Sequence, residues 1–165
     1  MRILGVDPGT QVVGCGIIDS DNLDTAMVYY GTIKPPAKFD MANRLNFIFN
    51  ELSAVVSKYK PDAVAIEQPF MAKNAKSALA IGKAQAVALL VAANQQVPAF
   101  EYTPRQVKQR IASYGASSKE QIQEMVRLQL GLSEVPEPDD AADALAVALC
   151  HLAEEHLNSL LREQK

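Results

Sequence analysis

The chain opens with RILGVDPGTQVVGCGIID, in which an acidic residue, Asp7, directly follows an apolar run. Residues 2–7 have the composition of a strand buried on both faces, and residues 12–19 predict a second strand after a Pro–Gly turn. The glycines of the second strand indicate a bulge or a close approach of another backbone. A carboxylate at the end of a buried strand is costly without a positive charge nearby, and Arg2 is the only cation in this stretch. The sequence therefore predicts that a counter-charge reaches Asp7 from elsewhere.

The rest of the chain predicts a third strand, a helix, a strand, a helix, a strand and then further helices. Apolar and β-branched runs predict the later strands at residues 25–33, 62–67 and 97–102. Apolar residues at helical spacing predict helices at residues 41–59, 75–94, from Pro104 onward, at 117–130 and from Asp139 to about Leu161. Thr103 is the expected N-cap of the third helix, and Ser117 with Glu120 is the expected capping box of the fourth.

This order of elements predicts an α/β fold built on one mixed five-stranded sheet with helices on both faces. Short turns join the first three strands as an antiparallel meander, and right-handed crossovers add the other two strands in parallel. The strand at 62–67 is then expected beside the strand at 2–7, and both end in a carboxylate, Asp7 and Glu67. Ligands of open α/β sheets gather at this carboxyl edge. Residues 1–165 are expected to form a single domain, frayed after about residue 160.

The final predicted helix begins with DDAADALAVALC and contributes further carboxylates. Asp140 and Asp143 are three residues apart and therefore share a face of the helix. Each of them alone fits an ordinary helix start, where acidic residues cap the backbone and complement the helix dipole. Together with Asp7 and Glu67 they form an oxygen-rich set, which suits Mg²⁺ or Mn²⁺ better than Zn²⁺.

The charges are unevenly distributed along the chain. Its net charge is −3, yet residues 69–119 carry +6 and the remainder carries −9. The basic stretch either lines a surface for phosphates or only supplies the solvated faces of helices, and the composition leaves both readings open. His151 and His156 are expected on a solvated helix face, and Cys15 and Cys150 as buried free thiols of a reducing compartment. No apolar run is expected to be long enough to span a membrane, and the start lacks the pattern of a cleavable signal.

Several motifs together resemble one family. GVDPGT followed by GCGIID, then AIEQPFMAKNAKSALAIGKAQ, RQVK and DAADALAVALCH look like the RuvC family of crossover junction endodeoxyribonucleases, the bacterial Holliday-junction resolvases. The resemblance extends from Arg2 to about His156. It implies a ribonuclease-H-like fold, a homodimer and Mg²⁺-dependent hydrolysis of DNA phosphodiesters near the crossover of a four-way junction, in homologous recombination and DNA repair. The family's acidic residues map onto Asp7, Glu67, Asp140 and Asp143.

The chemistry of phosphodiester hydrolysis agrees with the resemblance. Two metal ions ~3.5–4 Å apart can activate water and stabilise the leaving oxygen. We assign Asp7 as the bridging ligand, with Glu67, Asp140 and Asp143 completing the shells, and we expect Mn²⁺ to substitute for Mg²⁺. Phe70 is expected to stack on an unpaired base at the junction. Cytoplasmic location in a bacterium and a branch-migration motor as a further partner are implied as well. The basic residues expected to contact DNA, with most weight on Lys108 and Lys119, are Lys73, Lys76, Lys83, Arg105, Lys108 and Lys119.

The same residues admit other functions. GVDPGT also resembles the first phosphate loop of the actin and sugar-kinase fold, but the chain is short and lacks a second phosphate loop and an adenosine site. A junction binder without catalysis has no use for four carboxylates that repel phosphate, whereas a nuclease for another nucleic acid is the closer alternative. Asp139 and Asp140 compete for one metal role, because helix spacing allows either. The family pattern D-A-A-D selects Asp140 and leaves Asp139 as a helix cap.

Overall fold

The computed structural model describes residues 1–21, 24–69, 75–112 and 118–163. The strands form one five-stranded sheet in the order β3-β2-β1-β4-β5. Strands β1, β2 and β3 pair antiparallel, whereas β4 pairs parallel with β1 and with β5. This confirms the predicted mixed sheet and the predicted neighbours β1 and β4. The elements are β1 (Arg2–Asp7), β2 (Val13–Ser20), β3 (Thr25–Ile33), α1 (Met41–Tyr59), β4 (Ala63–Glu67), α2 (Ala75–Asn94), β5 (Ala99–Tyr102), α3 (Pro104–Ala112), α4 (Lys119–Gln129) and α5 (Asp139–Glu163).

The last strand is shorter than the pattern at 97–102 predicts, for a local reason. The backbone N–H of Val97 donates to the carbonyl of Ala92 at 2.9 Å, so it serves the end of α2 rather than the sheet. Pro98 has no N–H to give to a neighbouring strand. The strand therefore begins at Ala99.

The helix starts show one confirmed cap and one shifted cap. The hydroxyl of Thr103 accepts a hydrogen bond from the backbone N–H of Gln106 at 3.2 Å, which confirms the predicted N-cap of α3. In α4 the capping box is formed by Ser118 and Gln121, one residue later than predicted. Two consecutive serines followed by Glu and Gln allow both registers, and the predicted Ser117 lies outside the described residues.

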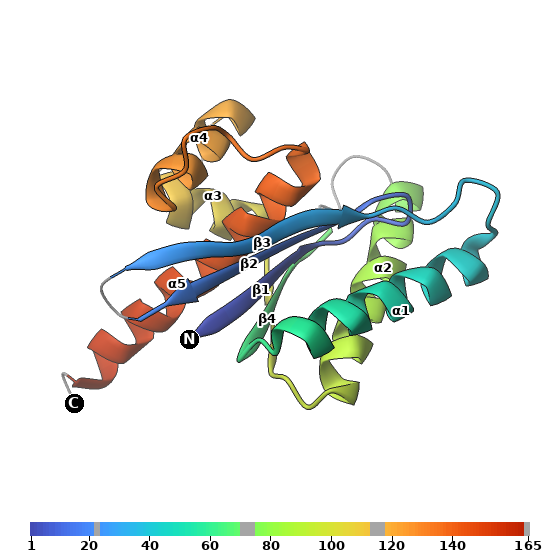
Figure 1. Ribbon diagram of the computed structural model, residues 1–165, viewed down its shortest axis with the longest axis horizontal. Coiled ribbons are helices and arrows are strands. Elements are labelled where there is room, and N and C mark those ends of the chain that lie inside the picture. Colours follow the sequence, from blue (N-terminus) through green and yellow to red (C-terminus); the bar gives the residue numbers. More distant parts are fainter. Residues whose placement is uncertain (22–23, 70–74, 113–117, 164–165) are drawn as a thin grey trace.

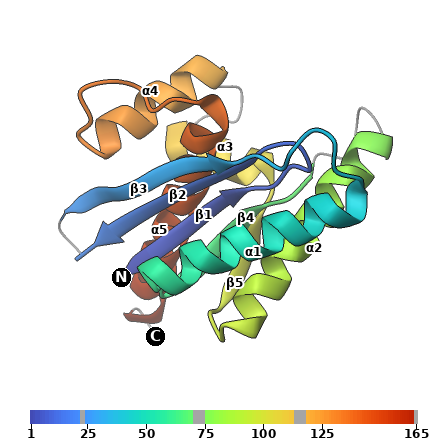
Figure 2. The same ribbon diagram turned by 45° about the vertical axis from the view of Figure 1, so that its right-hand side comes forward.

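The sheet carries a hydrophobic core on each face. Helices α1 and α2 cover one face, while α5 crosses the other with α3 and α4 beside it (Figure 1), as the turned view also shows (Figure 2). Leu4 and Val6 of β1 pack with α1 and α2, whereas Ile3 packs with α5. Because side chains alternate along a strand, Gly5 and Asp7 face α5 as well.

Helix α5 lies unusually close to the sheet because glycines face it. A Cβ atom placed on Gly5 would lie 1.9 Å from the carbonyl oxygen of Ala144, and one on Gly14 would lie 1.9 Å from the carbonyl oxygen of Asp140. No side chain fits in either gap, so the helix backbone rests directly on β1 and β2. The predicted close approach at the glycines of the second strand is therefore confirmed, and it fixes the height of α5 above the sheet.

Helix α2 departs from one expectation. It is 20 residues long and has the length and apolar composition of a membrane-spanning helix, although no such segment was expected. A core helix passes the same test, and Val87, Ala88, Val91 and Ala92 of α2 are buried against the core shared with α1. Length and composition alone are therefore weak support for a membrane span.

We expect Gly14→Ala to lower the free energy of unfolding by about 2 kcal/mol or more, because the new methyl group forces α5 away from the sheet. Urea unfolding of the purified variant measures this loss. Gly31→Ala is the matched control on β3, since its added Cβ would meet the hydroxyl end of the Tyr29 side chain at 2.6 Å, a group that can move aside. Equal losses for the two variants would contradict a special role for the contact under α5.

Candidate metal centre

Two carboxylates end neighbouring strands on the face that α5 covers. Asp7 is the last residue of β1 and Glu67 the last residue of β4, and the two strands pair in parallel up to Val6 and Ile66. Their carboxyl groups lie within hydrogen-bonding reach of each other, close enough to share a proton. The predicted juxtaposition of these two side chains at the carboxyl edge of the sheet is therefore present.

Helix α5 supplies the other two predicted carboxylates. Its first turn contains Asp140, whose carbonyl oxygen lies over Gly14, and Asp143 follows one turn later. Both carboxylates act electrostatically on Asp7, and Asp143 also acts on Glu67. All four predicted acidic residues thus lie within one electrostatic neighbourhood.

The protonation of this group reflects crowding of negative charge. Burial, followed by repulsion from Asp143 and Asp140, raises the pKa of Asp7 to about 7. Burial, followed by repulsion from Asp7, raises the pKa of Glu67 to about 8. Burial also raises the pKa of Asp143. A group of carboxylates responds in this way when it is short of positive charge.

Lys119 is a cation that lies among these acids. Its Nζ lies 3.1 Å from Oδ2 of Asp143 and 3.1 Å from Oδ2 of Asp139. It also acts on Asp7, where its positive charge partly offsets the rise in pKa. The counter-charge that the sequence predicted for Asp7 is thus supplied in part by the first residue of α4.

A hollow of about 190 Å³ opens beside this cluster. It combines two of the acids with the two lysines on which the sequence analysis placed most weight, and apolar residues of α3, α4 and α5 close its sides. Lys108 acts electrostatically on Glu67 across it. The acidic hollow, as we call it, is lined by Glu67, Pro104, Val107, Lys108, Lys119, Ile122, Asp143 and Ala146.

Asp139 does not act as the expected helix cap. Its Oδ1 accepts a hydrogen bond from Nε2 of Gln123 at 3.0 Å, and its Oδ2 pairs with Lys119. The carbonyl of Pro138 instead accepts from the backbone N–H of Ala141 at 2.9 Å. Asp139 therefore links α4 to α5, because its side chain turns toward α4 rather than back over its own helix.

The other predicted DNA-binding residues are not gathered at the acidic hollow. Lys76 and Lys83 are exposed on α2, which covers the opposite face of the sheet, and Arg105 is exposed on α3. Phe70 and Lys73 lie outside the described residues.

One histidine contradicts its expected place. His151 is 0% exposed rather than solvated, and its Nδ1 lies 2.6 Å from the hydroxyl of Tyr102. The burial of His151 could have been predicted, since it follows Ala144 and Val147 at helical spacing in an apolar run. His156 is exposed as expected, and Cys15 and Cys150 are buried free thiols as expected.

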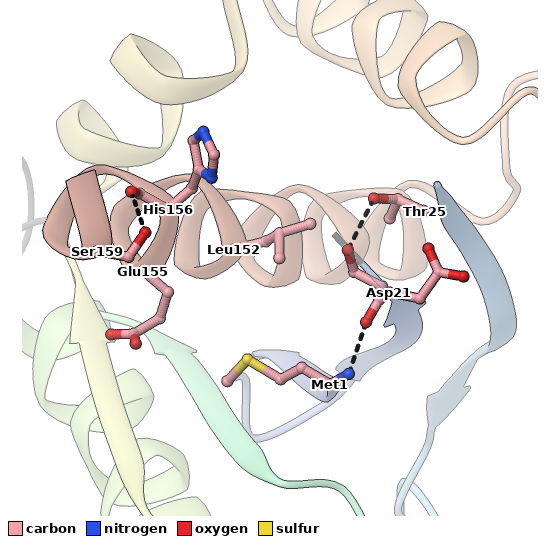
Figure 3. Close-up of a pocket in the computed structure, with 8 residues that line it drawn as sticks. Met1, Asp21, Thr25, Leu152, Glu155, His156 and Ser159 are labelled. Atoms are coloured by element: carbon pink, nitrogen blue, oxygen red, sulfur yellow. Dashed lines mark hydrogen bonds between the residues drawn. The ribbon is translucent and has the colours of Figure 1, made fainter. Parts of the chain in front are cut away.

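A larger hollow of about 510 Å³ lies near the N-terminus rather than at the carboxyl edge (Figure 3). The start of β1, the turn after β2 and the second half of α5 enclose it, with Met1, Asp21, Leu152 and His156 among its lining residues. Asp7 lies at the other end of β1. The larger hollow is therefore separate from the carboxylates.

The donor set fits a hard divalent cation. Among the described residues, no three acidic, cysteine or histidine side chains converge closely enough to enclose an ion in this conformation, since Glu67 bonds to Asp7 and Asp143 to Lys119. The four carboxylates nevertheless offer only oxygen ligands, which suit Mg²⁺ or Mn²⁺. The raised pKa values of Asp7 and Glu67 are those of oxygens that a cation would stabilise in ionised form.

Comparison with known proteins gives one consistent family. A family model described as "Crossover junction endodeoxyribonuclease RuvC" matches residues 3–151. A protein of that description from Dehalococcoides mccartyi is 54% identical over 163 residues, which cover 99% of this chain and 98% of the relative. Another from Syntrophomonas wolfei is 48% identical over 161 residues, covering 98% and 94%. The solved structure described as "T. thermophilus RuvC in complex with Holliday junction substrate" is similar with a TM-score of 0.90 and 33% identity over 96% of each chain.

We expect the metal-free protein to lose stability as the pH rises from 6.5 to 8.5. The folded pKa values of about 7 for Asp7 and about 8 for Glu67 lie above the ordinary values of 3.8 and 4.5. The stability from these two groups is fully present below about pH 4 and is lost as the pH rises through 7 and 8. Melting temperatures in EDTA measure the trend. Below pH 6.5 the lowered pKa of the buried His151 acts in the opposite direction, because the unfolded chain then takes up a proton.

Glu67→Gln should flatten this pH dependence and raise the melting temperature at pH 8.5. Glu134→Gln removes the same charge at an exposed position and is the matched control. A melting temperature that rose with pH between 6.5 and 8.5 would contradict the expected crowding of charge.

Proposed function

The chain belongs to the RuvC family of crossover junction endodeoxyribonucleases, and from this membership we propose that it resolves four-way DNA junctions by hydrolysing phosphodiester bonds near the crossover. One structural observation carries the assignment to a site: two strand ends and one helix bring four carboxylates together beside two lysines. The solved relative that is bound to a Holliday junction supports the choice of substrate. The other candidates considered above, a protein of the actin and sugar-kinase fold and a junction binder without catalysis, have no such support.

The four carboxylates are the proposed metal ligands. Asp7, Glu67, Asp140 and Asp143 would hold Mg²⁺, or Mn²⁺ in its place, and two ions are proposed. When bound, the metal supplies a Lewis acid that activates water and stabilises charge on the leaving oxygen. Burial and repulsion raise the pKa of Asp7 to about 7 and that of Glu67 to about 8, so a bound cation would stabilise their ionised form and displace the protons that they hold near neutral pH.

The two lysines of the acidic hollow are proposed to handle the phosphate. Lys108 lies half-buried on α3 across from Glu67. Lys119 is paired with Asp143, and a metal at Asp143 would compete for the same carboxylate oxygen. The released ammonium group would then donate to a phosphate oxygen of the substrate.

The remaining contacts are proposed from family membership. Lys76, Lys83 and Arg105 are exposed, and we place them against the arms of a junction. Phe70 and Lys73, outside the described residues, complete the set, with Phe70 stacking on a base. A branch-migration motor as partner and a bacterial cytoplasmic location belong to the same proposal.

A homodimer is proposed because two strands of like polarity must be cut, which a two-fold pair of sites permits. Helix α2 offers a surface for it. Leu79 and Leu90 are 67% and 56% exposed, and Ala86 and Ala93 are exposed on the same helix at spacings of seven, four and three residues. Such a stripe suits helix-to-helix packing.

We expect Asp7→Asn to slow cleavage of a labelled four-way junction by about a thousandfold, which is the several kcal/mol that charge stabilisation by a metal supplies. Binding of the junction in EDTA should persist, because the variant removes one charge that repels phosphate. The substrates to compare are a four-way junction, a linear duplex and an RNA–DNA hybrid, each with Mg²⁺ or EDTA.

Asp139→Asn is the matched control for this variant, since Asp139 pairs with Lys119 and Gln123 but is not a proposed ligand. It should cleave at close to the wild-type rate. Wild-type cleavage by Asp7→Asn would reject the metal assignment, and preference for the hybrid over the junction would reject the substrate.

We expect Leu90→Glu to shift the protein from dimer to monomer in sedimentation velocity at micromolar concentration, because a buried charge at a helix contact is costly. Leu128→Glu, on α4 and 54% exposed, is the matched control and should remain dimeric. A wild-type protein that is monomeric and still makes paired cuts would contradict the dimer.

A further inference from the structure

His151 connects α5 to the edge strand β5 through two aromatic side chains. The hydroxyl of Tyr102 lies 2.6 Å from Nδ1 of His151. The ring of Phe100 lies 4.5 Å from the imidazole ring, between centroids, with the planes inclined by 33°. Phe100 and Tyr102 are two residues apart, so both project toward α5. The side chain of His151 on α5 therefore lies against two side chains of the short strand β5, Phe100 and Tyr102.

The hydrogen bond joins the two side chains in either tautomer of the ring. Burial lowers the pKa of His151, so the imidazole is neutral at neutral pH. A neutral ring has one donor and one acceptor nitrogen, so Nδ1 either accepts from the hydroxyl of Tyr102 or donates to it. Nε2 is buried and has no hydrogen-bond partner among the described residues.

This arrangement is a poor way to fill a core. A buried polar nitrogen without a partner costs free energy that an apolar side chain of similar size would avoid. What a histidine provides and a leucine does not is a directional bond, which fixes both the distance and the angle between α5 and β5. The bond to Nδ1 is therefore the feature of His151 that requires an explanation.

The hydrogen bond joins β5, which pairs with the strand of Glu67, to α5, which carries Asp143. Tyr102 pairs with Glu67 in the β4–β5 ladder, and the backbone N–H of Gln68 donates to the carbonyl of Tyr102 at 2.8 Å. His151 follows Asp143 by eight residues on α5, about 12 Å along the helix axis. A shift of α5 relative to β5 would therefore change the separation of Asp143 from Glu67.

The glycine contacts do not reach the strands on the other side of the site. They lie under the first half of α5, between Asp140 and Ala148, and rest on β1 and β2. His151 meets β5, three strands away from β2 in the order of the sheet. The bond to Tyr102 therefore holds α5 against the part of the sheet next to Glu67, which the glycine contacts do not do.

We propose that His151 and Tyr102 form a latch that sets the angle of α5 across the sheet and thereby holds Asp143 at the distance from Glu67 that metal-dependent cleavage requires. The two are positioning residues and touch neither metal nor DNA. The latch rests on the proposed function for its catalytic consequence, but its effect on metal binding can be measured without DNA.

The test variant is Tyr102→Phe, which removes one oxygen atom and leaves the ring in place. We expect the Mg²⁺ concentration at the midpoint of thermal stabilisation to rise about tenfold. Single-turnover cleavage of the junction at a fixed, subsaturating Mg²⁺ concentration should fall by about ten- to a hundredfold, as misplacement of a supporting group does. Junction binding in EDTA should be unchanged. In the metal-free protein, the amides of residues 141–145 should exchange hydrogen faster.

Three further variants separate a latch from simple packing. His151→Leu keeps the apolar volume and should behave like Tyr102→Phe, and the double variant should be no slower than either single one. His151→Asn keeps a polar atom near the position of Nδ1 and should recover much of the wild-type Mg²⁺ midpoint. Leu52→Ala is the control, because Leu52 is buried on α1 on the opposite face and its loss lowers stability without touching the latch.

The latch is rejected if Tyr102→Phe and His151→Leu keep the wild-type Mg²⁺ midpoint at temperatures where they are folded, or if Leu52→Ala raises that midpoint equally. Should either latch variant not fold, His151→Asn decides, and a tenfold loss in that variant would also reject the latch. Absence of junction cleavage by the wild-type protein would reject the proposed function instead, while the Mg²⁺ midpoints would still test the latch.

Discussion

The direct contact between the backbone of α5 and the strands β1 and β2 is the constraint on which the site depends. Gly5 and Gly14 leave no side chain between sheet and helix, so Asp140 and Asp143 approach Asp7 from above at a fixed height. A longer side chain at either glycine would separate the carboxylates, whatever the residues of the cluster were. The glycines near the start of the chain therefore set the position of the acidic residues near its end.

Bringing the carboxylates close together costs electrostatic free energy, and several groups of the fold reduce that cost. Burial and mutual repulsion raise the pKa of Asp7 and of Glu67, and one proton shared between them relieves part of the strain. Lys119 relieves another part through its ion pairs with Asp139 and Asp143. Helices α3 and α4 thus do more than close the acidic hollow, because each brings a cation to acids that the sheet and α5 have gathered.

Much of the fold was predictable because the spacing of apolar residues and the length of each segment identify its helices and strands. The strand pairings followed from the meander and crossover rules, and Asp7 and Glu67 could be placed at one edge of the sheet. Contacts between side chains far apart in the sequence could not be predicted. Spacing does not reveal that Asp139 meets Gln123, or that His151 meets Tyr102, because each depends on how two helices or a helix and a strand cross. The capping box of α4 was displaced by one residue because two serines offer equivalent caps.

The ion pair between Lys119 and Asp143 has a thermodynamic consequence. At the proposed metal site, a divalent cation and the ammonium group would compete for the same oxygen of Asp143, so the hollow would act as an ion exchanger whose resting counter-ion is tethered to the chain. Binding of the cation would free a positive charge for phosphate, and phosphate bound to Lys119 would in turn leave Asp143 open to the cation. Linkage then requires that each ligand strengthens the other by the same factor. The proposed metal site would assemble most completely where nucleic acid is present.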